Sequence, residues 1–311
     1  MYPPMRGVYN ILATPFMPDG ALDETGLRRL VEFQIDKGAM GLTILGVLGE
    51  AAKMTLDERR RVMEIVMKAA ATRVPVIVGV SHPEMAAVIA LTREAMAAGG
   101  AGVMIAPPRM DAPTDDAIFA LYAEIADGVG DCPIVVQDFP PVNGVILSPQ
   151  VLARIADSIP TARTLKLEDP PLMQKISAVR ELTDKFAIFG GLGGMFFLEE
   201  LERGAAGTMT GFAFTEILIA VYKAYQAENI ACAAQIFDRY LPLIRFENQP
   251  VINLGIRKAL LQHRAAIDHA TLRPPFAPID ARTQNEMERI LKRVGIVDPT
   301  AKLTFEMKDC T

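Results

Sequence analysis

Eight short apolar runs, each followed by a longer segment with helical periodicity, constrain the fold of this chain more than any other feature. The runs are rich in Val, Ile, Leu and Thr, and they are almost continuously apolar, as parallel strands buried on both faces are. They span Val8–Thr14, Gly41–Leu45, Val74–Val80, Gly102–Ala106, Pro133–Gln137, Arg163–Leu167, Phe186–Gly190 and Ala206–Thr210. Eight strand–helix units over about 220 residues predict a (β/α)8 TIM barrel.

Helix-start signals between the runs support the barrel. Thr55 with Glu58 forms a capping box, Thr114 precedes two aspartates, and Ser148 precedes a proline. An open, doubly wound sheet is the main rival, but no Gly-x-Gly-x-x-Gly motif follows the first run. We therefore expect residues 1–227 to form the catalytic barrel.

The rest of the chain predicts a helical extension of the barrel, because no Gly/Ser linker separates the two. Amphipathic periodicity predicts helices over Ile217–Gln226, Ile230–Ile244 and Val251–His269. We expect residues 228–297 to pack on the barrel, and the short polar tail, residues 298–311, to be loosely held.

Composition and charge exclude several classes of protein. Half of the 311 residues are apolar and the net charge is −5, so the chain is not disordered and has no basic field for nucleic acid. No segment has the ~18 continuous apolar residues of a membrane span. Cys132, Cys232 and Cys310 lack the spacing of a disulfide scaffold or a zinc site. We expect a cytoplasmic protein without a metal, a cofactor, a nucleic-acid partner or a membrane partner.

In a TIM barrel the chemistry lies at the C-terminal ends of the strands, where the loops converge. Lys166 is the most informative residue there, because it alone among the lysines interrupts a predicted strand. Alternation places its side chain either in the barrel interior or beneath the helices. Burial disfavours a charged ammonium, and the neutral amine is a nucleophile for carbonyl carbon. The alternative is a structural lysine paired with Glu168.

Three other features at the predicted strand ends have a functional and a structural interpretation. The segment Gly46–Glu50 could hold a substrate or simply turn the chain. The run Gly190–Gly194 could cradle a phosphate, but a turn at the barrel mouth is the better interpretation. Asp138 could be a general base or could fix its loop by hydrogen bonds.

Several motifs occur in an order that points to a known family. They are Leu12–Phe16, Gly46–Ala51 leading into Thr55–Arg59, Pro75–Gly79 and Thr164–Lys166. Over roughly residues 5–295 the chain resembles the dihydrodipicolinate synthase/N-acetylneuraminate lyase family of class I aldolases. The resemblance implies that the Lys166 amine attacks C2 of a 2-oxo acid such as pyruvate, giving an iminium that acidifies the protons on C3.

The resemblance also implies the site and the assembly. We expect Lys166, Gln137 and Asp138 to be catalytic. The expected substrate-binding residues are Gly46, Val47, Leu48, Gly49, Glu50, Gly191 and Met209. Relatives are usually oligomers, so we expect a homo-oligomer, dimer or tetramer, which the apolar segment Ile217–Tyr225 could support.

The chain departs from the family around this lysine. The proton-shuttling tyrosine of the family aligns with Gln137, whose amide does not titrate, and two loop threonines are Val47 and Leu48. The aromatic pair after the fourth strand is Pro108–Arg109, and no arginine occurs in Phe139–Asn143, which counts against a synthase.

Other stretches favour a different branch of the family. Gln137–Asp138, Pro242–Ile244 and Glu247–Asn248 resemble the enzymes that dehydrate 2-keto-3-deoxy sugar acids. Proton transfer would then fall to Asp138, Glu168, a water or the substrate.

Our first hypothesis is therefore a Schiff-base lyase acting on such a sugar acid. The second is a dihydrodipicolinate synthase that condenses pyruvate with aspartate semialdehyde. The third is a catalytically silent barrel that binds a metabolite, and a phosphate-binding enzyme using Gly190–Gly194 is a distant fourth.

Overall fold

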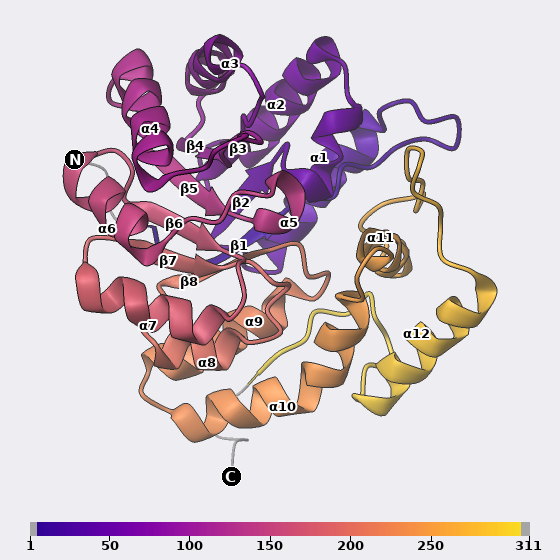
Figure 1. The fold of residues 1–311 in the computed structure, drawn as a ribbon. Helices are drawn as coiled ribbons and strands as arrows, with labels where there is room; N and C mark the ends of the chain where they lie inside the picture. Colours follow the sequence, from indigo (N-terminus) through magenta and orange to yellow (C-terminus); the bar gives the residue numbers. More distant parts are fainter. Residues whose placement is uncertain (1–4, 306–311) are drawn as a thin grey trace.

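The computed structural model describes residues 5–305, and in this range eight parallel strands close into a barrel with helices between them (Figure 1). The strands pair in chain order, and β8 closes the barrel against β1. They are β1 (Gly7–Ile11), β2 (Gly41–Ile44), β3 (Val76–Gly79), β4 (Gly102–Ile105), β5 (Ile134–Asp138), β6 (Thr164–Leu167), β7 (Ala187–Gly190) and β8 (Gly207–Thr210). The TIM barrel is confirmed, and every strand overlaps its predicted run.

Helices follow the strands, as the helix-start signals predict. They are α1 (Glu24–Asp36), η1 (Val47–Gly49), η2 (Ala51–Lys53), α2 (Leu56–Ala70), α3 (Met85–Ala97), α4 (Asp115–Val129), α5 (Pro140–Asn143), α6 (Pro149–Ser158), α7 (Leu172–Leu182), α8 (Phe197–Glu202) and α9 (Thr215–Gln226). Thr55 and Glu58 form a capping box at α2, and Thr114 and Ser148 cap α4 and α6 through their side chains. These caps satisfy amide groups that the first turn of a helix leaves unpaired.

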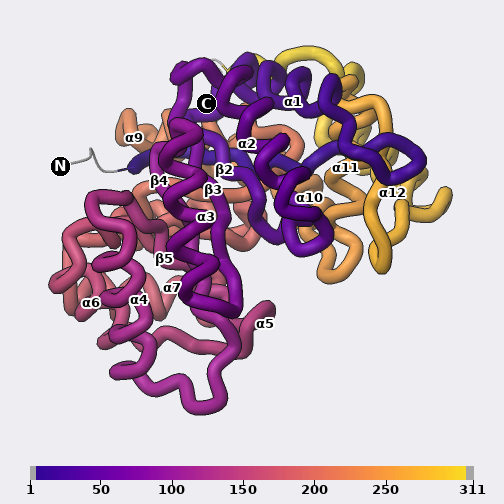
Figure 2. The backbone as a smooth tube through the Cα atoms, turned by 90° about the horizontal axis from the view of Figure 1, so that it is seen from above, coloured from indigo at the N-terminus to yellow at the C-terminus, as the bar shows by residue number. Residues whose placement is uncertain are grey.

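Three further helices form the C-terminal part. They are α10 (Ile230–Glu247), α11 (Asn253–His263) and α12 (Ala281–Arg293). Helix α10 packs along α9, while α11 and α12 lie to one side of the barrel in both views (Figures 1 and 2).

The C-terminal part differs from the predictions in three respects. The third predicted helix ends at His263 instead of His269, and α12 was not predicted. Helix α9 is buried between the barrel and α10, so it is not the exposed apolar surface that we expected to support an oligomer. Leu303 and Phe305 of the predicted tail pack against the core, and residues 306–311 lie outside the described range.

The core has two layers. An inner cluster, formed by Tyr9, Ile11, Ile77, Met104, Val135, Phe189 and Met209, fills the barrel. A larger outer cluster packs the other face of the strands against the helices. Because successive side chains of a strand point to opposite faces, membership of one cluster or the other gives the direction of each strand residue.

The cysteines and the helices bear on two further expectations. Cys132 is a buried free thiol, and Cys232 is buried in α10. Cys310 lies outside the described residues. Between residues 5 and 305, no helix combines the length and the apolar character needed to cross a membrane.

Candidate active site

Lys166 points into the barrel. Its neighbours Leu165 and Leu167 belong to the outer cluster, so alternation along β6 sends the lysine to the inner face. In the strand register it lies beside Gln137 of β5 and Phe189 of β7. Only 3% of its surface is exposed. Of the two positions open to it from the sequence, the structure selects the interior.

Glu168 and Gln137 meet the lysine there. Glu168 Oε2 lies 2.9 Å from Lys166 Nζ and accepts a hydrogen bond of 2.8 Å from Gln137 Nε2. All three side chains are buried. The pairing with Glu168 that the sequence offered as a structural alternative therefore exists, and it also gives the ammonium a carboxylate that can take its proton.

Gly191 makes room for this group. A Cβ atom at Gly191 would lie 2.3 Å from Glu168 Cγ, which is too close for any side chain. The structure thus brings Lys166, Gln137 and Gly191 together around Glu168. Glu168, which the sequence offered as one of several candidates for proton transfer, lies two residues after the inward-facing lysine and on the same face.

Asp138 points away from Lys166. It follows the inward-facing Gln137, so its side chain lies on the outer face of β5, where Oδ2 is 2.6 Å from Lys175 Nζ on α7. Lys175 also pairs with Asp169 at 2.7 Å. Burial raises the pKa of Asp138 to about 6, against the lowering effect of Lys175. The catalytic role predicted for Asp138 stays a prediction, and this geometry does not support it.

The turn after β2 is strained at both ends. Leu45 and Glu50 adopt left-handed backbone conformations, each with φ of 56°. Such residues cost on the order of 1–3 kcal/mol each and persist only where their surroundings hold them, often at functional sites. Between them, the amides of Val47 and Leu48 donate no hydrogen bond to the described part of the chain. The turn therefore offers two free donors at the C-terminal end of the barrel.

The other turn residues have distinct surroundings. Gly49 O accepts a hydrogen bond of 2.8 Å from the side chain of Thr14, which fixes the end of the turn. Leu48 packs against the inner cluster that contains Met209. Glu50 is buried and binds Lys258 and Lys53, so its carboxylate is not free for a substrate. Met209 itself is fully buried inside the barrel.

The glycine run after β7 accommodates polar side chains. A Cβ atom at Gly190 would meet the carboxylate of Glu200, and one at Gly193 would meet the amide of Asn248. Asn248 Nδ2 donates to Gly193 O at 3.3 Å. The run thus packs closely against protein groups on several sides, as expected of the turn rather than the phosphate cradle.

Two further results concern ligands. Within residues 5–305, no group of three or more His, Cys, Asp or Glu side chains is placed to hold a metal ion.

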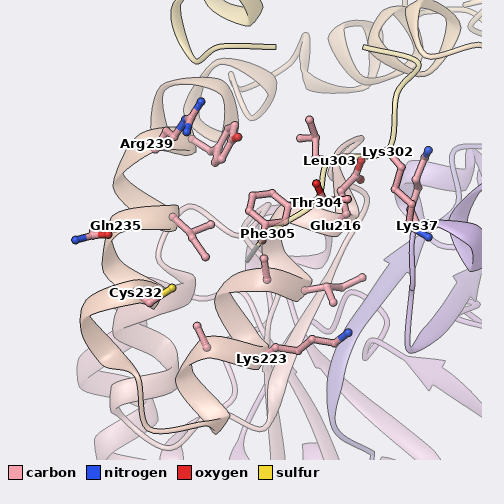
Figure 3. A pocket seen from close by; sticks show the side chains of 15 residues that line it. Lys37, Glu216, Lys223, Cys232, Gln235, Arg239, Lys302, Leu303, Thr304 and Phe305 are labelled. Carbon is pink, nitrogen blue, oxygen red and sulfur yellow. The ribbon is translucent and has the colours of Figure 1, made fainter. Parts of the chain in front are cut away.

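A cavity of about 640 Å³ lies between α9, α10 and residues 302–305, with Lys223, Arg239 and Lys302 on its wall (Figure 3). None of the predicted site residues lines this cavity, so it is separate from the Lys166 site.

Comparison with known proteins adds to this geometry. The model of the dihydrodipicolinate synthetase family matches residues 4–294. An L-2-keto-3-deoxyarabonate dehydratase from Azospirillum brasilense is 32% identical over 298 residues, covering 94% of this chain and 95% of the relative. A 4-hydroxy-tetrahydrodipicolinate synthase from Methanothrix thermoacetophila is 31% identical, covering 93% and 97%. The crystal structure of a dihydrodipicolinate synthase from Rhodopseudomonas palustris superposes with a TM-score of 0.88 at 37% identity, covering 93% and 97%.

Proposed function

Because this chain belongs to the dihydrodipicolinate synthetase family, we propose that it is a Schiff-base lyase that removes water from a 2-keto-3-deoxy sugar acid. The observation that carries the proposal is the buried group of Lys166, Glu168 and Gln137. Lys166 supplies the nucleophile, and within residues 5–305 Glu168 is the carboxylate that contacts it. The dehydratase relative from Azospirillum brasilense supports this branch.

Imine formation begins with the ion pair. Glu168 takes a proton from the Lys166 ammonium, and the free amine attacks C2 of the substrate. Glu168 then returns the proton to the C2 hydroxyl of the resulting carbinolamine, which leaves as water and gives the iminium. The substrate carboxylate would accept hydrogen bonds from the free amides of Val47 and Leu48.

The same carboxylate can complete the elimination. The iminium withdraws electrons from C3, so Glu168 can remove a C3 proton and form the enamine. The enamine expels the C4 hydroxyl, which leaves as water with the proton held by Glu168. Hydrolysis of the conjugated iminium then frees Lys166 and an unsaturated 2-oxo acid. The Gln137 amide cannot relay protons, but its hydrogen bond orients Glu168.

A synthase is the second candidate, favoured by the 37% identity to the structure from Rhodopseudomonas palustris. Mixing the protein with pyruvate and aspartate semialdehyde separates the two. We expect dehydration of a 2-keto-3-deoxy sugar acid and negligible condensation; condensation at an ordinary enzymatic rate would contradict the proposed dehydratase.

Imine trapping tests the chemistry common to both candidates. Borohydride reduction with pyruvate should add the mass of the reduced adduct to Lys166, and the Lys166→Met variant should show none. A wild-type protein that gains no mass would instead favour the silent barrel. Trapping across a panel of 2-oxo acids would then identify the substrate by its half-saturating concentration.

The remaining expectations about organisation are also part of the proposal. We propose that the barrel of residues 1–227 carries the chemistry, with residues 228–297 packed on it, and that the enzyme works as a cytoplasmic homo-oligomer. Exposed apolar side chains, such as Val142 of α5 and Ile146 in the loop that follows it, support an interface between copies. Light scattering should give the mass of a dimer or a tetramer.

A further inference from the structure

Several donors converge on the carboxylate of Glu50. Its Oε1 lies 2.6 Å from Lys258 Nζ, and its Oε2 lies 2.9 Å from Lys53 Nζ. The backbone amide of Arg273 donates to Oε2 at 3.0 Å. The side chains of Glu50 and Lys258 are fully buried. Buried ion pairs often add little net stability, so a role in fixing local geometry is the better interpretation of this one.

Two of these donors come from the C-terminal extension. Lys258 lies on α11, and it also donates to Thr271 O at 2.8 Å. The guanidinium of Arg273 donates to Lys53 O at 2.7 Å and pairs with Glu58 of α2. The extension therefore holds the segment after β2 through both side chains and backbone.

Glu50 is the C-terminal end of the strained turn. Glu50 adopts a left-handed conformation, and its amide donates to Val47 O, so the residue that carries the buried carboxylate also closes the turn that contains the Val47 and Leu48 amides. At the other end of the turn, Leu45 O lies so close to Gly79 that no Cβ would fit there. Both ends of the turn are therefore fixed by contacts, and the contact at Glu50 depends on the extension.

We propose that Lys258 is a positioning residue. Through Glu50 it fixes the turn whose amides receive the substrate carboxylate, so the C-terminal extension sets the affinity of the barrel for 2-oxo acids. The part of this inference that concerns substrate affinity rests on the proposed function. The part that concerns the conformation of the turn does not.

The kinetic test compares two buried cations of the same extension. In Lys258→Met, the pyruvate concentration that half-saturates borohydride trapping at Lys166 should rise about tenfold, with the extent of trapping at saturation unchanged. Lys258→Arg keeps the charge and should recover part of the loss. Arg264→Met removes a buried pair with Glu216 that does not touch the turn, and should leave the half-saturating concentration as in wild type.

Hydrogen–deuterium exchange tests the turn without any chemistry. Lys258→Met should speed exchange of the hydrogen-bonded amides of Gly49 and Glu50, and Arg264→Met should not. Wild-type exchange in Lys258→Met, or equal acceleration in both variants, would overturn the proposal. If Lys258→Met exchanges faster but the wild-type protein traps no 2-oxo acid, Lys258 still fixes the turn and the proposed function is rejected.

Discussion

Glu168 occupies the position from which a single carboxylate can serve every proton transfer at Lys166. Its Oε2 touches both the lysine and Gln137, so the charge is held in place without a titrating tyrosine. The sequence indicated Lys166 because a charge inside an apolar strand is costly. It named Glu168 as one of several candidates for proton transfer but could not choose among them, because the contacts between side chains on neighbouring strands depend on the fold.

The Glu168→Gln variant should separate binding from proton transfer. An amide of the same shape keeps the packing against Gly191 but cannot accept a proton, so kcat for dehydration should fall by roughly 10²–10⁴. Borohydride trapping of pyruvate should slow but still reach Lys166. Thermal unfolding serves as the control for folding. Dehydration within threefold of wild type would remove Glu168 from the mechanism.

At the scale of elements, the sequence predicted what local patterns determine. The strands are continuously apolar, and the caps at α2, α4 and α6 are read from three or four adjacent residues. Helix α12 buries only Met287, Ile290 and Leu291, but their i, i+3 and i+4 spacing and the Asp280 N-cap are helix signals that the prediction missed. Lys53, a partner of Glu50, is only three residues away, whereas the partners Lys258 and Arg273 lie more than 200 positions along the chain and could not be predicted from local sequence.

The cap of α4 gives a stability prediction for a single element. Thr114 Oγ1 accepts a hydrogen bond from Ala117 N, at an exposed site away from Lys166. Thr114→Ala should therefore lower the free energy of unfolding by about 1 kcal/mol without changing imine trapping. Thr114→Ser keeps the hydroxyl and should retain most of that energy. Denaturant unfolding measures both; an alanine variant as stable as wild type would show that the cap is replaced by water.

For the whole molecule, buried acids of the outer layer set how stability depends on pH. Glu200 of α8 is fully buried, its Oε2 has no hydrogen-bond partner in the described chain, and burial raises its pKa to about 8. Burial also raises the pKa of Asp138, to about 6. The Arg273 guanidinium instead lowers the pKa of Glu58 to about 2. The raised pKa values of Glu200 and Asp138 lower the stability of the fold as pH rises. The lowered pKa of Glu58 lowers its stability as pH falls.

Glu200 should dominate the loss of stability towards neutral and alkaline pH. The folded protein keeps its proton up to about pH 8, whereas the unfolded chain releases it near 4.5, so the folded state binds more protons across that window. The free energy of unfolding must therefore fall as pH rises from 4.5 to 8 and then level off. Glu200→Gln keeps a neutral side chain of the same shape, and it should flatten this decline in urea unfolding. If Glu200→Gln loses as much unfolding free energy as wild type between about pH 5 and about pH 8, Glu200 ionises freely in the folded protein.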